Sequence, residues 1–492
     1  MGIDQGTTGT TALVLDQNWN IVASGYREHT QIYPQPSWVE HDPLEIWERV
    51  RETVAAALQS GGLSAADLRC IGIDNQGETV MIWDRRTGIP LYNAIVWQDR
   101  RTAAAADELA AGCGGMIREK TGLVVDAYFS ATKIRWILDQ VPGAREKAAN
   151  GELLAGTLDT WLIWKLTGGK VHVTDYSTAS RTMLLNIHTG RWDREILDQL
   201  AIPGDLLPEI ADSAAVFGIT DPDAFFGAAV PISGSVVDQQ AALFGQACSR
   251  PGTIKTTYGT GCFMLMNTGD QPVFSPNGLL TTIAWGLERK LTFALDGGVY
   301  ITGAAVQWLR DGIKIIDNAA ETEALALSVP DSGGVYFVPA FVGLAAPHWD
   351  QYARGMMIGI TGGTSRAHLV RATLESIAYL VKDNLDAMRK DSGIPVTVMR
   401  VDGGAVVNRF LMQFQADILG IPVDVPVINE TTALGAAYLA AMGLGDFKSP
   451  DEVAANWKLR CRYEPRMSED ERESRLYQWR RAVERSKAWI EK

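Results

Sequence analysis

Two short segments of the same kind, half a chain apart, constrain the fold of this sequence more than any other feature. The first is Gly2-Ile3-Asp4-Gln5-Gly6-Thr7-Thr8-Gly9-Thr10, which continues into the apolar run at residues 12–15. The second, at residues 252–263, repeats the order of an apolar run, a turn of Thr and Gly, and another apolar run. Each pattern predicts a β-hairpin, because Gly allows a tight turn and the flanking residues suit paired strands. The repetition predicts two related α/β domains, each presenting one such turn.

The first turn has a chemistry that suits a phosphate group. Backbone N–H groups in a glycine-rich turn can approach an anion, and Thr7 and Thr8 add hydroxyl donors. Asp4 lies at the start of the turn, where a hydrated Mg²⁺ could bridge its carboxylate to phosphate oxygens. The simpler interpretation is a polar hairpin turn that binds nothing, since Gly/Thr turns are common.

Length and composition set the broad class of the protein. A chain of 492 residues predicts two or three domains. We place a boundary between residues 247 and 248, which divides the chain into residues 1–247 and 248–492. The formal net charge of −13 argues against general affinity for nucleic acid or for an anionic membrane. Five scattered cysteines without C-x-x-C spacing indicate reduced thiols. With no signal peptide before Asp4 and no membrane-length apolar run, we expect a cytoplasmic protein.

The spacing of apolar residues predicts alternating strands and helices, as in an α/β fold. Helical spacing is clearest at residues 43–59 and 368–388. A predicted strand at 396–401 leads into Asp402-Gly403-Gly404-Ala405-Val406-Val407-Asn408, and a strand, a glycine turn and a helix can present backbone N–H groups to a nucleotide. A plain strand-to-helix turn is the alternative. The charged tail at residues 452–492 predicts a covering helix.

Carboxylates are the main candidates for catalysis. The chain has no Walker A sequence, no G-x-G-x-x-G, no G-x-S-x-G and no metal-type pairing of His. Asp238 follows an apolar run and precedes an Ala-rich helix, so it either caps that helix or accepts a proton from a hydroxyl group. Polar residues with Trp at 74–79 and 97–101 suit a polyol, although solvated loops would have the same composition.

Together these motifs resemble the FGGY carbohydrate kinases, and within that family the glycerol kinases, over essentially the full chain. The first family signature corresponds to Tyr128-Phe129-Ser130-Ala131-Thr132-Lys133 and continues to residue 140. The second runs from Gly355 through Gly359-Ile360 and His368-Leu369 to residues 372–375. Further similar stretches lie at residues 156–165, 172–186, 257–269 and 400–420.

The resemblance implies two actin-like ATPase (ribonuclease H-like) domains with a cleft between them. It implies transfer of the γ-phosphoryl group of ATP, with Mg²⁺, to a terminal hydroxyl of glycerol, which gives glycerol 3-phosphate. Asp238 would be the general base and, with Asp4, a metal-side carboxylate. The residues implied to face the phosphates are Thr7, Thr8, Gly9, Thr260, Gly303 and Gln307, and those implied to flank the adenosine are Gly404, Ala405 and Asn408. The residues implied to line the polyol site are Gly77, Glu78, Trp97, Tyr128, Asp238, Gln239 and Phe263.

Two departures from the family pattern concern the polyol site. Glycerol kinases carry Arg at the position of Gly77, where it binds a substrate hydroxyl. Its replacement removes a charged donor and is expected to open space, which favours either weaker glycerol binding or a polyol or sugar of four to five carbons. The family's Gly before the catalytic Asp is Val237 here, which is expected to crowd the turn without removing the base.

Two further departures lie outside that site. Residues 217–230 lack the basic loop that binds fructose bisphosphate in some bacterial glycerol kinases, so we do not expect that regulation. Only Met1, Gly2 and Ile3 precede Asp4, so the first strand is expected to be clipped and to support Asp4 poorly.

Two other classes of protein stay open on the sequence. A catalytically silent polyol-binding homologue would keep the fold, and an ATPase of the actin or chaperone type would hydrolyse ATP without a polyol. ATP turnover with and without polyol distinguishes these classes from a kinase. The family further implies a homodimer or homotetramer.

Overall fold

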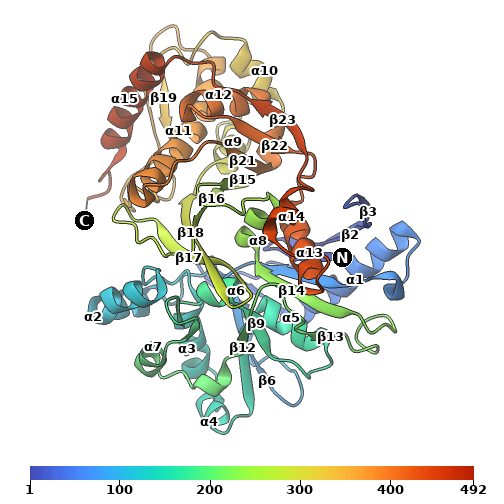
Figure 1. Cartoon of the computed structure of the whole chain (residues 1–492). Coiled ribbons are helices and arrows are strands. Elements are labelled where there is room, and N and C mark those ends of the chain that lie inside the picture. Colours follow the sequence, from blue (N-terminus) through green and yellow to red (C-terminus); the bar gives the residue numbers. More distant parts are fainter. Residues whose placement is uncertain (492) are drawn as a thin grey trace.

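Each half of the chain is built on a mixed β-sheet, and the two sheets share one topology (Figure 1). The computed structural model describes residues 1–491. In each sheet, a central strand pairs antiparallel with the strand that follows it and parallel with a later strand. The first sheet has the order β13 (Gly218–Ile219), β14 (Pro231–Val237), β5 (Ile71–Asn75), β1 (Gly2–Gln5), β2 (Gly9–Leu15) and β3 (Ile21–Glu28). The second has the order β17 (Leu280–Leu287), β18 (Lys290–Val299), β16 (Cys262–Gly269), β15 (Ile254–Tyr258), β21 (Met399–Gly403), β22 (Val423–Pro426) and β23 (Leu459–Tyr463).

Both predicted hairpins are confirmed. The first joins β1 to β2, and the second joins β15 to β16. β1 and β15 occupy equivalent places, since β1 pairs parallel with β5 and β15 pairs parallel with β21. The two Gly/Thr turns therefore lie at the same point of two related sheets.

The expectation that the first strand supports Asp4 poorly is wrong. All four residues of β1 pair with β2 on one side and with β5 on the other. The ammonium group of Met1 donates a hydrogen bond to the carbonyl oxygen of Cys70 at 2.9 Å. A short strand suffices here because a neighbour on each side satisfies its backbone groups.

The helices cover both faces of these sheets, as the apolar spacing predicts (Figure 1). In the first half, a smaller sheet of β4 (Glu40–His41), β7 (Ala94–Ile95), β6 (Val80–Asp84) and β8 (Leu153–Thr157) extends the domain. Its main helices are α1 (Pro43–Gly61), α2 (Ala103–Thr121), α3 (Ser130–Gln140), α5 (Leu158–Leu166), α6 (Tyr176–Ser180) and α8 (Asp238–Gly245). Those of the second half are α9 (Gly303–Gln307), α10 (Glu321–Leu327), α11 (Arg366–Ser392), α12 (Arg409–Leu419), α13 (Thr431–Gly443) and α15 (Glu469–Ser486).

Helix α13 belongs to the second half of the chain but packs on the sheet of the first half. A Cβ atom at Gly2 would lie 2.0 Å from the carbonyl oxygen of Ala433. A Cβ atom at Gly72 would lie 2.0 Å from that of Ala436. Backbones can approach this closely only where glycine removes the side chain. The two halves are thus joined by a close contact of α13 with β1 and β5.

The prediction that the tail is a covering helix is only partly correct. β23 pairs antiparallel with β22 and extends the second sheet, and α15 follows it. Arg462 in β23 pairs with Asp424 at 2.6 Å, while Cys461 and Tyr463 pack on the core. The alternation of charged and apolar residues is that of an edge strand, and the high charge of the whole tail masked it.

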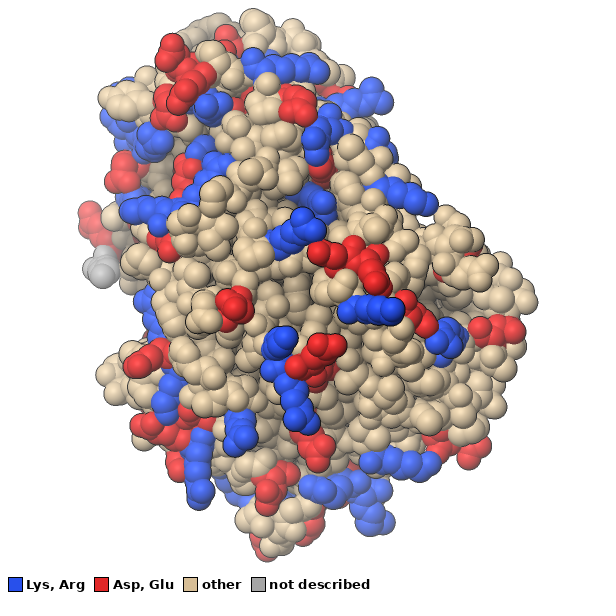
Figure 2. Space-filling view, in the orientation of Figure 1, with Lys and Arg blue, Asp and Glu red and all other residues tan. Residues whose placement is uncertain are grey.

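The described surface carries mixed charges. Figure 2 shows Lys and Arg interspersed with Asp and Glu on the face it presents. A broad basic patch is missing from that face, in line with the net charge of −13. Within residues 1–491, none of the helices has the length and apolar character needed to span a membrane.

Candidate functional site

Three neighbouring parallel strands bring three carboxylates together. Asp4 in β1 is in register with Asp74 in β5, and Asp238 begins α8 directly after β14, which pairs with β5. Burial raises the pKa of Asp4 to about 7, and the charge of Asp238 adds to the rise. Burial and the neighbouring Asp4 raise the pKa of Asp74 well above its usual value. A ligand site at the carboxyl ends of parallel strands is the usual arrangement in α/β folds.

Asp74 and Lys255 belong to this group of residues, and sequence reasoning did not identify either as a site residue. Asp74 is fully buried beside Asp4. Lys255 is also fully buried, and its ammonium donates to Gln239 Oε1 and, at 3.0 Å, to Thr257 Oγ1. The available signals were weak: an Asp within an apolar strand, and a Lys within the second hairpin.

Asp238 is held at the start of α8 and faces this lysine. The backbone N–H of Gln239 donates to Asp238 Oδ1 at 2.6 Å. Burial raises the pKa of Asp238, while the charge of Lys255 opposes the rise. Because Lys255 comes from β15, a cation of the second half acts electrostatically on the carboxylate of Asp238 in the first half.

The carboxylates fit a hydrated divalent cation rather than a cage of protein ligands. Among residues 1–491, no three His, Cys, Asp or Glu side chains are arranged to enclose a metal ion. Mg²⁺ typically keeps several waters and takes one or two carboxylates together with phosphate oxygens. Asp4 and Asp238 provide that donor set beside the first Gly/Thr turn.

The first turn is connected to the predicted polyol residues. Thr8 is exposed, and Thr7 Oγ1 accepts a hydrogen bond from Trp97 Nε1 at 2.8 Å. Gly9 is required by packing, because a Cβ atom there would lie 2.5 Å from the carbonyl oxygen of Arg27. Trp97 therefore links the first turn to Tyr128, another predicted polyol residue, whose ring it meets.

The second turn packs against the beginning of α9. The N–H of Gly303 donates to the carbonyl oxygen of Gly259 at 3.1 Å. The carbonyl oxygen of Thr260 accepts from the N–H groups of Thr302 and Ala304, both at 3.0 Å. The structure thus brings Thr260 and Gly303 together, and Gln307 lies exposed at the end of α9.

The predicted strand, glycine turn and helix at 396–408 is confirmed as secondary structure. Gly404 is exposed in the turn between β21 and α12, and Ala405 follows it half-buried. Asn408 caps α12, since its Oδ1 accepts from the N–H of Leu411 at 2.9 Å. Its Nδ2 donates to Thr322 Oγ1 at 3.1 Å, so the side chain is held in place by α10 and α12.

Two of the predicted polyol residues, Glu78 and Tyr128, lie at a buried ion-pair network. Glu78 Oε1 accepts from Arg181 Nε at 2.6 Å, and Arg181 Nη1 lies 3.0 Å from Asp296 Oδ2. The rings of Trp97 and Tyr128 meet edge to face with centres 5.6 Å apart. Burial raises the pKa of Glu78, and the charge of Arg181 opposes the rise.

Tyr128 and Phe263 are the other two aromatic residues that the sequence predicts for the polyol site. The ammonium of Lys133 donates to the carbonyl oxygen of Tyr128 at 2.9 Å, and burial lowers the pKa of Lys133 to about 7. Phe263, half-buried in β16, pairs with Gly298 of β18. The ion pair of Arg181 with Asp296 brings this strand, β18 of the second half, to the predicted polyol residues Glu78 and Tyr128.

The expectation that Gly77 opens space is wrong, whereas the charged donor expected to be missing at position 77 is indeed absent from the sequence. A Cβ atom at position 77 would lie 2.8 Å from Val237 Cγ2, so the valine fills that space. It would also lie 3.9 Å from Cγ of Arg181, whose guanidinium is buried beside Glu78. Arg181 was missed because the matching stretch 172–186 gave no role to any single residue.

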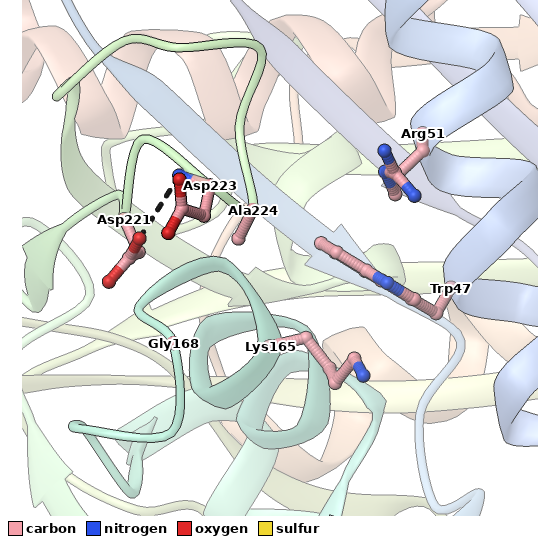
Figure 3. A pocket seen from close by; sticks show the side chains of 7 residues that line it. All are labelled: Trp47, Arg51, Lys165, Gly168, Asp221, Asp223 and Ala224. Carbon is pink, nitrogen blue, oxygen red and sulfur yellow. Dashed lines mark hydrogen bonds between the residues drawn. The ribbon is translucent and has the colours of Figure 1, made fainter.

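Figure 3 shows a surface pocket of about 410 Å³ that is separate from this group of residues. Trp47 and Arg51 of α1 and Lys165 of α5 line it, and Asp221 and Asp223 lie across from them. The ammonium of Lys165 lies 5.4 Å from the centre of the Trp47 ring. None of the predicted site residues lines this pocket.

Without divalent cations, we expect Asp4 to make the protein less stable as pH rises from about 4 to about 7. The folded state keeps the Asp4 proton up to a pKa of about 7, whereas unfolded Asp loses it near pH 4. Between these values the unfolded state binds fewer protons, so raising the pH favours unfolding, by on the order of 1–4 kcal/mol. Urea unfolding at low and neutral pH in EDTA measures this loss, and Asp4→Asn should lack it. Equal losses in both proteins would contradict the expectation.

The whole chain is similar to known kinases. Glycerol kinase 2 of Thermotoga maritima is 60% identical over 490 residues, covering 99% of each chain. A glycerol kinase of Caldanaerobacter subterraneus is 58% identical over 492 residues, covering 100% of this chain and 99% of the relative. The crystal structure of Plasmodium falciparum glycerol kinase with ADP aligns with a TM-score of 0.93 at 38% identity, covering 100% of this chain and 98% of that one. Residues 1–245 match the N-terminal domain of the FGGY family of carbohydrate kinases, and residues 254–444 match its C-terminal domain. The chain therefore belongs to the FGGY family of carbohydrate kinases.

Proposed function

We propose that this protein transfers the γ-phosphoryl group of ATP to a terminal hydroxyl of glycerol. The observation that carries the proposal is the 60% identity over 490 residues to a protein named glycerol kinase. The electrostatic interactions of Asp238 with Asp4, Lys255 and Arg181 support it. Phosphoryl transfer depends on positioning and charge stabilisation, which such an arrangement supplies.

We propose the following roles for the site residues. Asp238 accepts the proton of the attacking hydroxyl group, and its raised pKa brings its basicity closer to neutral pH. Glu78, Trp97, Tyr128, Gln239 and Phe263 orient the polyol. The turn residues Thr7, Thr8, Gly9, Thr260, Gly303 and Gln307 face the phosphates, and Gly404, Ala405 and Asn408 flank the adenosine. Mg²⁺ held beside Asp4 and Asp238 would neutralise charge on the phosphate oxygens.

Lys255 extends this set of roles. Its ammonium contacts Gln239 and faces Asp238 from the other half of the chain. A fixed buried cation stabilises negative charge that develops during transfer, since water does not screen it there. Because Lys255 lies in the second half, its contact with Gln239 next to Asp238 depends on how the two halves are positioned relative to each other.

We further propose the domain division at residues 247 and 248, a cytoplasmic location, and a homodimer or homotetramer. The matched family domains end and begin at residues 245 and 254, which supports that boundary. Helix α13 is an exception to this division, because it belongs to the second domain in sequence but packs on the first domain. Size-exclusion chromatography with light scattering tests the oligomer.

A polyol panel tests the proposed activity. We expect kcat/KM for glycerol to exceed those for erythritol and xylitol by at least about tenfold, because Val237 fills the space beside Gly77 that a longer substrate would need. Higher kcat/KM for the longer polyols would favour the second candidate, a kinase of four- to five-carbon substrates. ATP turnover that no polyol stimulates would indicate an ATPase, and binding without turnover would indicate a silent homologue.

A further inference from the structure

Arg181 is a buried guanidinium in the middle of the predicted polyol site. Its side chain is 6% exposed, and it lies between Glu78 Oε1 at 2.6 Å and Asp296 Oδ2 at 3.0 Å. Although burial disfavours the charged form, these two carboxylates raise the pKa of Arg181 above its already high usual value. The guanidinium is therefore always charged and has little freedom to move.

One nitrogen of this guanidinium has donor capacity that the protein does not use. Nη1 is buried and makes no hydrogen bond of good geometry, although it lies within ion-pair distance of Asp296. Buried donors are nearly always satisfied, so an unused donor beside a predicted substrate site points to a ligand acceptor. A hydroxyl oxygen of a polyol is an acceptor of the right kind.

Besides Glu78, a second predicted polyol residue, Tyr128, lies beside Arg181, together with Phe129. Its guanidinium carbon lies 5.9 Å from the centre of the Tyr128 ring and 5.7 Å from that of Phe129. Its charge also acts on Asp238, the proposed base. A polyol whose reacting hydroxyl lies at Asp238 has its remaining hydroxyls within this same group of residues.

Gly77 and Val237 form a matched pair that supports this arrangement. Cγ2 of Val237 fills the space beside Gly77, and a Cβ atom added at Gly77 would lie only 2.8 Å from it. The N–H of Val237 donates to Ser177 Oγ at 2.9 Å, which ties the end of β14 to α6. Arg181 is the residue that follows α6. A side chain at 77 would displace Val237 and, through it, helix α6, which Arg181 directly follows.

We infer that Arg181 binds the polyol, donating from Nη1 to a hydroxyl other than the one that is phosphorylated. Gly77 and Val237 are positioning residues for it. The inference rests on the proposed function and names a determinant of its substrate specificity. It assigns the charged donor of this site to Arg181, directly after α6, rather than to the segment that contains Gly77.

The first test compares glycerol with propane-1,2-diol and propane-1,3-diol, each of which lacks one glycerol hydroxyl. Arg181→Lys keeps the charge but loses the planar donor, and we expect kcat/KM for glycerol to fall by about 10- to 100-fold. The loss should be much smaller for the diol that lacks the contacted hydroxyl, so the ratio of glycerol to that diol falls toward one. Arg191→Lys, at an exposed arginine, should change neither value.

The outcomes separate the inference from the proposed function. Absence of glycerol phosphorylation by the wild type would refute the proposed function and the inference with it. Normal wild-type activity, with an equal loss for all three substrates in Arg181→Lys, would refute the inference alone and assign Arg181 a structural role.

A second test does not require changing Arg181. Gly77→Ala should raise KM for glycerol by about tenfold, because the new Cβ meets Val237 Cγ2 at 2.8 Å. Adding Val237→Ala removes that methyl group and should return KM to within about threefold of wild type. Losses that simply multiply in the double variant would contradict the matched pair.

Discussion

Replacing Asp238 with Asn is expected to lower kcat by about 10²- to 10⁴-fold while leaving the protein folded. The amide keeps the shape of the side chain but cannot accept the proton of the attacking hydroxyl. Its carbonyl oxygen can still accept the N–H of Gln239, which bonds Asp238 Oδ1 at 2.6 Å in the wild type. Steady-state kinetics with ATP and glycerol measure the fall.

The same variant should keep or raise the thermal unfolding temperature. Burial raises the pKa of Asp238, so the ionised carboxylate costs stability at neutral pH and the neutral amide does not. Asp205→Asn, at an exposed carboxylate in the same half, controls for a general effect of removing charge. Near-normal kcat in Asp238→Asn would refute its role as base. A large loss of stability would assign the lost activity to misfolding.

The parts of the fold that the sequence predicts best are those with strong local signals. Both Gly/Thr hairpins formed as expected, and the helix expected at residues 368–388 is α11, Arg366–Ser392. The β23 strand was not predicted, because its pairing with β22 is a tertiary contact that the charged composition of the tail obscures. The support that β1 gives Asp4 was underestimated for the same reason, since two neighbouring strands pair with it.

The site residues also differ in how well the sequence predicts them. Asp4 and Asp238 stand beside recognisable turns, so their sequence context singles them out. Arg181, Lys255 and Asp74 gain their positions only when distant segments meet: Arg181 pairs with Asp296 across the two halves. Gly77, in the turn after β5, and Val237, at the end of β14, are also far apart in the sequence, so their clash could not be inferred and the two departures seemed independent.

The other large effect is expected from Gly435→Ala in α13. A Cβ atom at this position would lie 1.9 Å from the carbonyl oxygen of Ala241, a backbone atom of α8 that has no room to shift. Overpacking of this kind costs about 1–3 kcal/mol and occasionally more. Because the new Cβ would meet backbone atoms of α8 rather than a flexible side chain, we expect a cost at the upper end of that range. Because α8 begins with Asp238, displacement of that helix should also lower kcat. Urea unfolding and steady-state kinetics on the same preparation measure both effects.

Gly115→Ala in α2 is the matched control for that prediction. It changes the same residue type within a helix, but a Cβ atom at Gly115 meets no atom within 4 Å. Alanine favours a helix over glycine by about 0.8–1.0 kcal/mol, so this variant should be slightly more stable than the wild type with unchanged kcat. Opposite signs in the two variants would show that stability depends on the contact between α13 and α8 rather than on helix propensity. If Gly435→Ala is as stable as Gly115→Ala or more stable, the two halves can separate at this contact without cost. Asp238 is then positioned by β14 alone.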